Sequence, residues 1–591
     1  MKNLILVLSA LAVALCLVSC SKKEPKISVF SDHIMTISQQ EGISFADAAA
    51  CVKAMGYDAA DVWVFSTDEM IKTLDSLGFG HSCAIGLVNF FEDDWKLPFP
   101  GHEWNAQDLC LEFVAKHGYK KLMLVPMGRG ESTLPEEEMM RRMADFIARA
   151  NAQGVDVLFE DNDNLTSDVH CTADLERVFN AIPAAGHAFD TGNYLANGED
   201  ALEAYAKFRD RIRHVHLKDR YSPDNMASCA SFTGCIPMEK LVRDLQKSGY
   251  DGYYTIEIFN SRHMLSDVET SIRNLRTVLS GKSVSVEKKD IGLQLYSVQE
   301  LGSDFEGALD RIAGMGYTSV EISNYAPGQK MFGYSPAELR KVIENHGLKL
   351  KSSNTMGAGI DIAHPQECLE AWKQVLADHQ AMGCQYLALV GIFAWGDEAQ
   401  AAKTCDLLNQ VGTLARDYGI RFLYHNHNME FHPLQGSALA PIDYMLQHTD
   451  PEAVNFELDV YWTMQGKRDP VQMIRQNPGR ILVLHIKDYY VLGESGKLDY
   501  KAIFDAFYET GHSDYFVEME PESTMEQADQ TAAFMYNLSE YLAHRQAGGQ
   551  RAGAGLASGQ AEPVDPAPIL AKSLEDIAKS CCFILSAPFV K

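Results

Sequence analysis

The sequence lacks several features that would each point to a particular class of protein. It lacks an excess of positive charge, because 52 lysines and arginines stand against 80 aspartates and glutamates and leave a formal charge of −28. A nucleic-acid partner requires a basic face, so this balance argues against one, and it gives no support for binding to anionic lipid. The 13 cysteines include no pair at CxxC spacing, which argues against a zinc ribbon.

Two further absences narrow the fold. No Gly-x-Gly-x-x-Gly sequence follows the first expected strand, Ile27–Phe30, so nothing supports a dinucleotide-binding fold. No internal repeat with a period of roughly 20–50 residues is present, which excludes a solenoid.

The N-terminus has the pattern of a processing signal. Lys2 precedes an apolar run, Leu4–Val18, which is too short to span a bilayer. Leu17-Val18-Ser19-Cys20 resembles the lipobox of bacterial lipoproteins. The resemblance implies that residues 1–19 are removed, that Cys20 is lipidated, and that residues 20–26 tether the protein to a membrane of the bacterial cell envelope. The alternative is an ordinary cleaved signal with a chance cysteine.

The rest of the chain is a duplication. His214-Val215-His216-Leu217-Lys218-Asp219 returns as Val483-Leu484-His485-Ile486-Lys487-Asp488, and other positions return with it at offsets of 260 to 269 residues. These further matches are Met55-Gly56-Tyr57 with Met315-Gly316-Tyr317, Asp190 with Asp459, and Glu257 with Glu518. Nearly constant offsets over a whole domain length indicate two copies of one domain, and 591 residues suit two cores of roughly 250 residues each.

Short apolar segments alternate with amphipathic ones in each copy, as they do in parallel βαβ units. The candidate strands of copy one are Ile27–Phe30, Asp61–Phe65, Cys83–Val88, Lys121–Val125, Val155–Glu160, His187–Asp190, His214–Lys218 and Tyr253–Ile258. Those of copy two are Ile291–Leu295, Ser319–Ile322, Leu348–Ser352, Tyr386–Val390, Arg421–His425, Asn455–Asp459, Ile481–Ile486 and Tyr515–Met519. The pattern predicts an α/β fold with two tandem (β/α)8 TIM barrels; an open doubly wound sheet is the alternative.

The domain boundaries follow from changes in composition. We expect the first barrel over residues 27–280, a polar linker over 281–290 and the second barrel over 291–545. Residues 546–591 form a low-complexity tail, in which Gln546–Pro568 is rich in Ala, Gly, Gln and Pro and is expected to be disordered. Ile569–Lys591 could form a short helix that is too short to span a membrane, and no role for the tail follows from its sequence.

Ionisable residues recur at the ends of consecutive strands of copy one. Chemistry in a (β/α)8 barrel takes place at the C-terminal ends of the strands. Strands five to eight end there with Glu160, Asp190, His216 and Glu257. Three carboxylates and one imidazole suit a divalent cation such as Mn²⁺, Co²⁺ or Mg²⁺, and Zn²⁺ is a further candidate. Each of these residues alone would more often be a helix cap, a rim ion pair or a structural histidine, so the prediction depends on the joint pattern.

These segments resemble the xylose isomerase-like TIM-barrel superfamily of sugar phosphate isomerases and epimerases. The segments that carry the resemblance are Phe189-Asp190-Thr191-Gly192-Asn193, His214–Asp219, Tyr254–Glu257, Gly292–Ser297, Tyr424-His425-Asn426-His427, Leu458-Asp459, His485–Asp488 and Phe516-Val517-Glu518. The resemblance implies a divalent metal held by Glu160, Asp190, His216 and Glu257, with Glu160 and Glu257 also serving as the acid–base pair. It implies a sugar or keto-sugar substrate, but the superfamily holds many activities.

Copy two departs from this pattern at one position. His425 stands where copy one has Glu160, whereas Asp459, His485 and Glu518 are retained. Imidazole also binds these cations, so we expect His425, Asp459, His485 and Glu518 to be ligands. One carboxylate of the acid–base pair is nevertheless lost, and copy two is therefore either a site with different proton chemistry or a metal-binding relic.

Other polar residues are candidates for contact with substrate. They are Asn193, Lys218, His427 and Lys487. For the two lysines the alternative is an ion pair with the adjacent aspartate that fixes the strand end. Trp63, His81 and Arg129 are further candidates for the lining of the pocket, each equally consistent with a structural role.

The predicted function is a metal-dependent isomerase or epimerase that moves a carbon-bound proton of a sugar or keto-sugar. The first alternative is a lyase or dehydratase with the same metal site, and the second is a carbohydrate-binding lipoprotein without catalysis. A DNA-repair endonuclease shares the barrel, but the charge of −28 and the secretion signal argue against it. The expected partners are a small sugar and, through the lipid anchor alone, a membrane; the sequence leaves the oligomeric state open.

Overall fold

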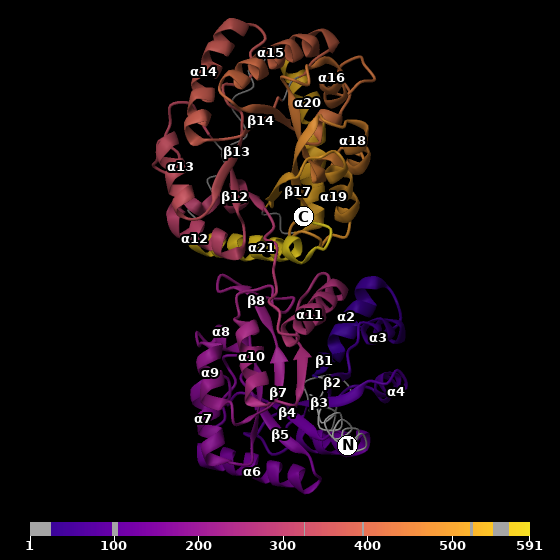
Figure 1. Cartoon of the computed structure of the whole chain (residues 1–591). Coiled ribbons are helices and arrows are strands. Elements are labelled where there is room, and N and C mark those ends of the chain that lie inside the picture. Colours follow the sequence, from indigo (N-terminus) through magenta and orange to yellow (C-terminus); the bar gives the residue numbers. More distant parts are fainter. Residues whose placement is uncertain (1–24, 97–104, 324, 393–394, 521–523, 548–565) are drawn as a thin grey trace, which may run out of the picture. The chain divides into compact units, whose positions relative to one another are not determined.

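The computed structural model consists of two closed barrels, each built from eight parallel strands. It describes residues 25–96, 105–323, 325–392, 395–520, 524–547 and 566–591. The strand order is β1-β10-β7-β6-β5-β4-β3-β2 in the first barrel (barrel 1) and runs consecutively from β11 to β18 in the second (barrel 2). The predicted tandem (β/α)8 fold is confirmed, and Figure 1 shows each barrel as a sheet surrounded by helices.

Barrel 1 alternates strands and helices, with one inserted hairpin. Its elements are β1 Lys26–Phe30, α2 Ser31–Glu41, α3 Phe45–Ala54, β2 Ala59–Trp63, α4 Asp68–Ser76, β3 Gly80–Val88, α5 Ala106–His117, β4 Lys121–Pro126, α6 Glu136–Ala152, β5 Asp156–Glu160, α7 Thr172–Ala181, β6 Gly186–Asp190, α8 Asn193–Ala196, α9 Ala201–Phe208, β7 Ile212–Leu217, β8 Asp219–Ser222, β9 Asn225–Cys229, α10 Met238–Ser248, β10 Tyr253–Ile256 and α11 Met264–Leu279. Helix α2 and the hairpin of β8 and β9 were not predicted from the sequence, because neither shows a clear apolar period.

Barrel 2 repeats the pattern with two helices after its last strand. Its elements are β11 Gly292–Gln294, η1 Leu295–Ser303, α12 Phe305–Met315, β12 Ser319–Ser323, α13 Pro336–Asn345, β13 Lys349–Thr355, α14 Pro365–Met382, β14 Tyr386–Val390, α15 Glu398–Asp417, β15 Arg421–His425, η2 Met429–Phe431, α16 Pro441–His448, β16 Asn455–Asp459, α17 Val460–Gln465, α18 Pro470–Gln476, β17 Ile481–Lys487, α19 Tyr500–Glu509, β18 Asp514–Glu518, α20 Met525–Ala547 and α21 Pro566–Ser586.

The strands form where apolar residues alternate with small or polar ones that point into the barrel. In β16, Phe456 and Leu458 pack outward into the core between sheet and helices, whereas Glu457 and Asp459 share the inner face. The predicted and observed strands begin and end within a few residues of each other, and Tyr386–Val390, Arg421–His425 and Asn455–Asp459 coincide with β14, β15 and β16. Local periodicity was therefore sufficient to locate the strands.

The last helix, α21, takes the eighth place in the outer ring of barrel 2. It packs against η1 and α12. Its Phe583 lies beside Tyr500 of α19, and Phe589, which follows the helix, lies beside Phe504 of α19. In barrel 1 the corresponding position, between the first and the seventh helix, is filled by α11, which contacts α2 and α10. The second compact unit extends to Lys591 and therefore includes α21 together with barrel 2.

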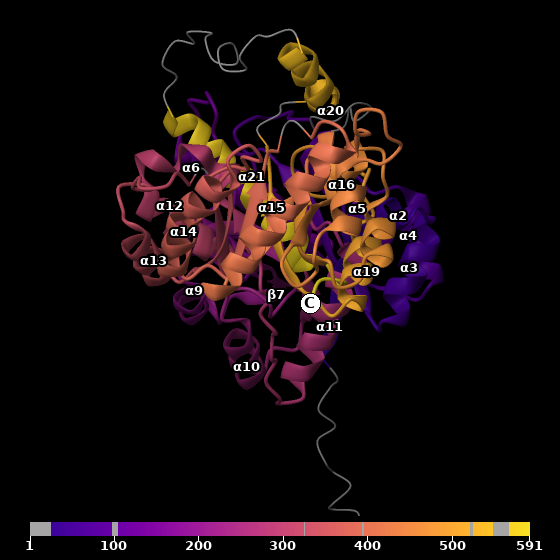
Figure 2. The ribbon, with the colours of Figure 1, turned by 90° about the horizontal axis from the view of Figure 1, so that it is seen from above.

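Two features attach α21 to barrel 2. Its inward side is buried: Ile577 and Ile584 are fully covered, and the Tyr317 hydroxyl donates to the Ile577 carbonyl at 2.9 Å. At its C-terminus, the Lys289 ammonium donates to the carbonyls of Ile584, Leu585 and Ala587 at 2.6–2.9 Å. A cation at this end satisfies carbonyls that the helix leaves unpaired. The expected helix in the tail is therefore a structural part of the barrel (Figure 2).

Helix α20, which directly follows β18 along the chain, lies elsewhere. It contacts η2 and α17, which follow β15 and β16, and it buries Ala528 and Ala532 against Tyr461, Trp462 and Tyr489. These partners lie on the C-terminal side of the strands, so α20 covers part of the side at which a TIM-barrel site is built.

Four sequence predictions fall wholly or mostly on residues that the structure does not describe. The signal peptide, Cys20 and most of the tether lie within residues 1–24, and most of the segment predicted to be disordered lies within residues 548–565. They stay predictions. Within the described part of the chain, we find no helix with the length and hydropathy needed to span a bilayer.

Candidate metal centre and active site

Barrel 1 brings its four predicted ligands to the C-terminal rim. Glu160 and Asp190 end β5 and β6, His216 is the penultimate residue of β7, and Glu257 follows β10 directly. The parallel register places Asp190 beside His216. One ligand atom from each of the four residues lies within 4.8 Å of the others, and all four side chains are buried. This spacing is compatible with coordination of a single ion.

His216 is fixed from both sides. Its Nδ1 lies 2.9 Å from Glu257 Oε2 and also contacts Glu160 Oε1, whereas its Nε2 lies 3.1 Å from Asp61 Oδ2. Asp61 is fully buried one layer below the rim, where it also binds His214 at 2.6 Å. A carboxylate behind a metal-binding histidine fixes the ring orientation and the tautomer. Nδ1 of His216 is thus the nitrogen directed toward the site.

Lys218 lies inside the cluster rather than beside Asp219. Its Nζ is 2.5 Å from Glu257 Oε1, 3.3 Å from Asp190 Oδ2 and 2.8 Å from Asn193 Oδ1. Asp219 instead accepts backbone hydrogen bonds from Arg220, Gly234 and Ile236. The alternative reading of Lys218-Asp219 as an ion pair is therefore wrong, and both Lys218 and Asn193 face the site.

The surroundings shift the pKa values of Glu160 and Glu257 in opposite directions. Burial raises the pKa of Glu160 above its usual range, although His216 opposes the change. Burial also disfavours ionised Glu257, but Lys218 and His216 outweigh it and lower the pKa of Glu257 to about 2. Two carboxyl groups whose pKa values move apart can serve as an acid and a base in one site.

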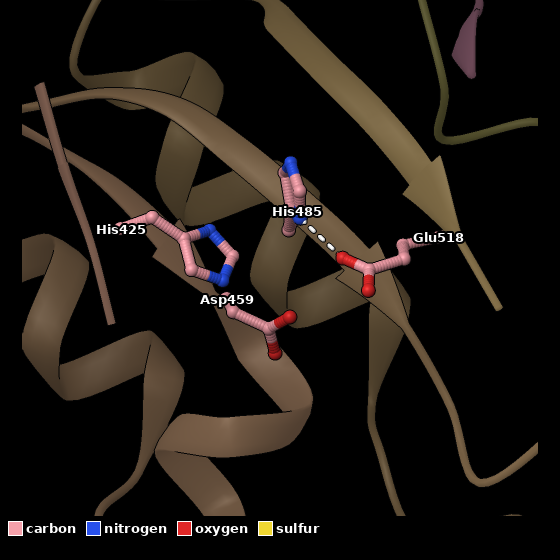
Figure 3. A group of neighbouring side chains, drawn as sticks. All are labelled: His425, Asp459, His485 and Glu518. Atoms are coloured by element: carbon pink, nitrogen blue, oxygen red, sulfur yellow. Dashed lines mark hydrogen bonds and ion pairs between the residues drawn. The ribbon is translucent and has the colours of Figure 1, made fainter. Parts of the chain in front are cut away.

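Barrel 2 assembles the corresponding group from His425, Asp459, His485 and Glu518. All four side chains are buried, and one ligand atom from each lies within 4.8 Å of the others. Figure 3 shows the four side chains turned toward one another, with a hydrogen bond between His485 Nδ1 and Glu518 Oε2 at 2.6 Å. The register pairs Asp459 with His485, as it pairs Asp190 with His216 in barrel 1.

A layer of carboxylates below this group was missed by the sequence analysis. Glu321 Oε2 lies 2.6 Å from His485 Nε2, as Asp61 lies behind His216, and Glu457 Oε2 lies 3.0 Å from His425 Nδ1. Asp61 and Glu321 both occupy the third position of the second strand of their barrel. A charged residue at the same place in two otherwise apolar strands is the signal that would have identified them.

The remaining predicted contacts also lie at the mouth of barrel 2. His427 has its ring centroid 5.1 Å from that of His425 and 5.2 Å from that of Trp462. Lys487 Nζ contacts Glu520, lies 3.4 Å from Glu518 Oε1 and stands 4.8 Å from the centroid of the Trp462 ring. Glu520 was not predicted, because it lies beyond the end of β18.

A cavity of about 410 Å³ opens above the barrel 2 cluster. Its lining includes His425, His427, Glu518 and Glu520, and the rest is mainly amide, hydroxyl and phenol groups: Gln294, Tyr296, Ser323, Tyr325, Asn354 and Thr355, with Met356, Val390 and Gly391. No lysine or arginine is among these lining residues. The cavity is therefore lined mainly by hydrogen-bonding side chains beside the four-residue group.

Three further candidates for the pocket lining have other partners. His81 lies near the N-terminal end of β3, where it binds Asp75 at 2.8 Å and stacks on Tyr119, which fits the structural role given as its alternative. Trp63 ends β2 and donates to Asp32 at 2.9 Å. Arg129 donates to the Leu134 carbonyl at 2.6 Å.

The residues fit a divalent cation in both barrels. Asp459 Oδ2 is a buried oxygen without a hydrogen-bond partner in the described structure, whereas Asp190 Oδ2 faces the Lys218 ammonium at 3.3 Å; both oxygens belong to the four-residue groups. An unpaired buried carboxylate oxygen is costly unless a cation faces it. The oxygen and imidazole donors are also those that Mn²⁺, Mg²⁺, Co²⁺ and Zn²⁺ accept.

Comparisons with known proteins identify the family of the chain. The sequence profile of the xylose isomerase-like TIM barrel family matches residues 49–278 and again residues 309–538. The chain therefore belongs to this family and carries two of its domains in tandem.

Individual relatives add detail. An inosose dehydratase from Geobacillus kaustophilus (strain HTA426) is 25% identical over 202 residues, which cover 30% of this chain and 60% of that protein. The chain spans about half the length of the curated relatives it matches. Two solved structures, both titled sugar phosphate isomerase/epimerase from Parabacteroides distasonis ATCC 8503, are 27% and 30% identical. They cover 52% and 51% of this chain and 98% and 100% of their own, with TM-scores of 0.42 and 0.40.

Proposed function

We propose that barrel 1 is a divalent-metal-dependent isomerase or epimerase that moves a carbon-bound proton next to the carbonyl of a sugar or keto-sugar. The observation that carries the proposal is the group of Glu160, Asp190, His216 and Glu257, which is buried at one rim with one ligand atom of each residue within 4.8 Å of the others. Family membership supports an enzyme of this superfamily, while its substrate and its use of metal belong to the proposal.

The residues divide the work in the following way. Asp190, His216 and the two glutamates would hold the cation, which when bound supplies positive charge that stabilises developing charge on the substrate oxygens. Glu257, held ionised by Lys218 and His216, removes the proton from carbon. Glu160, whose pKa is raised by burial, returns a proton from another side. Return to the same carbon gives epimerisation, and return to its neighbour gives isomerisation.

A dehydratase is the second candidate, and the inosose dehydratase relatives favour it. The first step is the same removal of a proton by Glu257. Glu160 then protonates a departing β-hydroxyl group instead of a carbon, and water leaves. The two reactions differ only in where the second proton goes, so the same four residues serve both.

The test is exchange of carbon-bound protons in D₂O, followed by NMR with the metal-loaded full chain and a panel of unphosphorylated keto-sugars and cyclic keto-polyols. We expect exchange with at least one of these compounds, and a loss of roughly 10²–10⁴-fold in the Glu257→Gln variant. Glu239→Gln, a substitution of the same type on α10, is the control. Loss of water, seen as a product lighter by one water molecule, identifies a dehydratase.

Two outcomes would overturn the assignment. Binding of a sugar without any exchange would leave a carbohydrate-binding protein without catalysis. Exchange that disappears in Glu518→Gln but persists in Glu257→Gln would place the chemistry in barrel 2. The lipid anchor is part of the proposed localisation and is tested separately, by metabolic labelling with a fatty acid in the natural chain and in Cys20→Ala.

A further inference from the structure

The two rim sites differ at two positions that change together. The last residue of the fifth strand is Glu160 in barrel 1 and His425 in barrel 2. The third residue of the sixth strand is Ala188 in barrel 1 and Glu457 in barrel 2. Barrel 2 thus has an imidazole where barrel 1 has a ligand carboxylate, and a carboxylate in the layer below where barrel 1 has a methyl group.

The two changed residues contact each other. Glu457 Oε2 lies 3.0 Å from His425 Nδ1, and both side chains are buried. With Nδ1 hydrogen-bonded to a carboxylate, Nε2 is the nitrogen that carries the lone pair for a ligand. Figure 3 shows the His425 ring with its other nitrogen turned toward Asp459. The geometry is that of a carboxylate-supported metal ligand.

The same arrangement exists around the other histidine of the site. His485 Nδ1 faces Glu518, and its Nε2 lies 2.6 Å from Glu321 Oε2. Both oxygens of Glu321 have protein partners, because the Ser352 hydroxyl donates to Oε1 at 2.6 Å and the Gln294 side-chain amide donates to Oε2. We therefore assign Glu321 the role of orienting the His485 ring and do not count it among the metal ligands. Glu321 is thus the nearer carboxylate to His485 Nε2 at 2.6 Å, while Glu457 Oε2 lies 3.0 Å from His425 Nδ1 and 3.3 Å from His485 Nε2.

We infer that barrel 2 is a second, purpose-built metal centre with two imidazoles and two carboxylates, in which Glu457 positions His425, and that it selects Zn²⁺ over Mn²⁺ more strongly than barrel 1. If His425 were only a non-functional substitution at the position of Glu160, nothing would favour a second change that buries Glu457 against it. Burial of a new carboxylate is costly unless a partner compensates it.

The preference follows from the donor sets. Barrel 1 offers three carboxylates and one imidazole, whereas barrel 2 offers two of each. Carboxylates suit Mg²⁺ and Mn²⁺, and imidazole suits Zn²⁺ and other borderline cations. Raw affinity favours Zn²⁺ over Mn²⁺ at any such site, so the informative quantity is the difference in the Zn²⁺-to-Mn²⁺ ratio between the two barrels. The inference rests on the proposed function only in taking both barrels to bind a divalent cation.

The experiment isolates each barrel within the full chain. His216→Ala removes the barrel 1 ligand, and His485→Ala removes the barrel 2 ligand. Each chain is stripped with a chelator and reloaded with equal concentrations of Mn²⁺ and Zn²⁺, and bound metal is measured by elemental analysis. We expect the Zn²⁺-to-Mn²⁺ ratio to be on the order of tenfold higher in the His216→Ala chain, in which barrel 2 is intact.

The role of Glu457 is tested in the same background. Glu457→Gln should weaken Zn²⁺ binding by roughly 10–100-fold, as loss of such a supporting group does elsewhere. Glu430→Gln is the matched control, because Glu430 is equally buried in barrel 2 but binds Tyr424 and the His427 amide rather than His425. The double change His425→Glu with Glu457→Ala should shift the ratio toward that of barrel 1.

X-ray absorption spectroscopy of the unsubstituted chain, loaded with half an equivalent of Zn²⁺, counts the imidazole ligands of the bound zinc. This measurement does not depend on the folding of any variant. Two imidazoles per zinc are expected, and one would overturn the inference. An equal metal ratio in the two barrels, unchanged affinity in Glu457→Gln, or an empty barrel 2 beside a loaded barrel 1 would also overturn it while leaving the proposed function standing. Metal in barrel 2 alone would overturn the proposed function instead.

Discussion

The C-terminal helix offers a direct test of how barrel 2 is closed. Ile577 lies on the inner side of α21 and is fully buried, whereas Ile569, on the same helix, is 36% exposed. Replacement of a fully buried isoleucine by alanine costs about 2–5 kcal/mol through lost burial and the cavity left behind. The same replacement at an exposed position usually changes stability by less than about 0.5 kcal/mol. The gain in helix propensity from isoleucine to alanine is common to both variants and cancels.

These energies convert into a measurable shift. A domain of this size loses roughly 2–4 °C in Tm for each kcal/mol, so Ile577→Ala should lower the melting temperature of barrel 2 by roughly 4–20 °C. Ile569→Ala should stay within about 2 °C of the unsubstituted chain. The assay is differential scanning calorimetry of the full chain, with hydrogen exchange of peptides from η1 and α12 to locate the effect. Equal shifts in the two variants would refute the place of α21 in the outer ring.

Three other predictions follow from single groups. Gly412→Ala should destabilise barrel 2 by about 1–3 kcal/mol in urea unfolding, because a Cβ at this position would come within 2.1 Å of the Ala453 carbonyl oxygen. Gly302→Ala, which has open space around it, is the control and should leave stability unchanged. An unchanged stability in Gly412→Ala would contradict the close approach to Ala453. Burial lowers the pKa of His379 to about 4, so at acid pH the folded protein binds fewer protons at this residue than the unfolded protein does. The stability that depends on neutral His379 is present above pH 6.5 and is lost as the pH falls toward 4, so His379→Leu should remove roughly 2–3 kcal/mol of the loss between pH 7 and 4.5. Urea unfolding midpoints at both pH values measure this, and an equal loss of stability in the variant and the unsubstituted chain would refute it. Lys218→Met should destabilise the metal-free chain, because it leaves the buried carboxylates of Glu257 and Asp190 without the Lys218 ammonium. Addition of Mn²⁺ should then raise the Tm of this variant by more than it raises the Tm of the unsubstituted chain. An equal rise in the two proteins would show that Lys218 and the metal do not share these carboxylates.

Local patterns accounted for much of the architecture. Each strand is a short run whose own residues alternate between the barrel interior and the surrounding helices, so β14, β15 and β16 were recovered at their observed ends. The duplication added a second copy of the evidence, since Asp190 and Asp459 recur with the same spacing to His216 and His485. Because parallel strands end at a common rim, residues at strand ends could be predicted to meet without knowledge of the packing.

Other parts of the site depend on contacts between residues far apart in the chain. Asp61 reaches His216 across 155 positions, and Glu321 reaches His485 across 164. Neither contact could be predicted from periodicity within one segment, because it forms only when the closed barrel brings an interior residue of the second strand against the histidine of the seventh strand. The signal was present as a charged residue in an apolar strand, but only the closed barrel shows which histidine it serves.

The sequence by itself determined the two barrels and the eight residues that gather at their rims, because alternation along a strand and the common direction of parallel strands are local properties that a repeat reveals. Only the tertiary structure decided that Glu457 supports His425, that Lys218 binds Glu257 rather than Asp219, and that α21 closes the second barrel in place of α20. Each of these depends on which surfaces remain to be covered once the strands have closed into a ring, and that is a property of the whole packed chain.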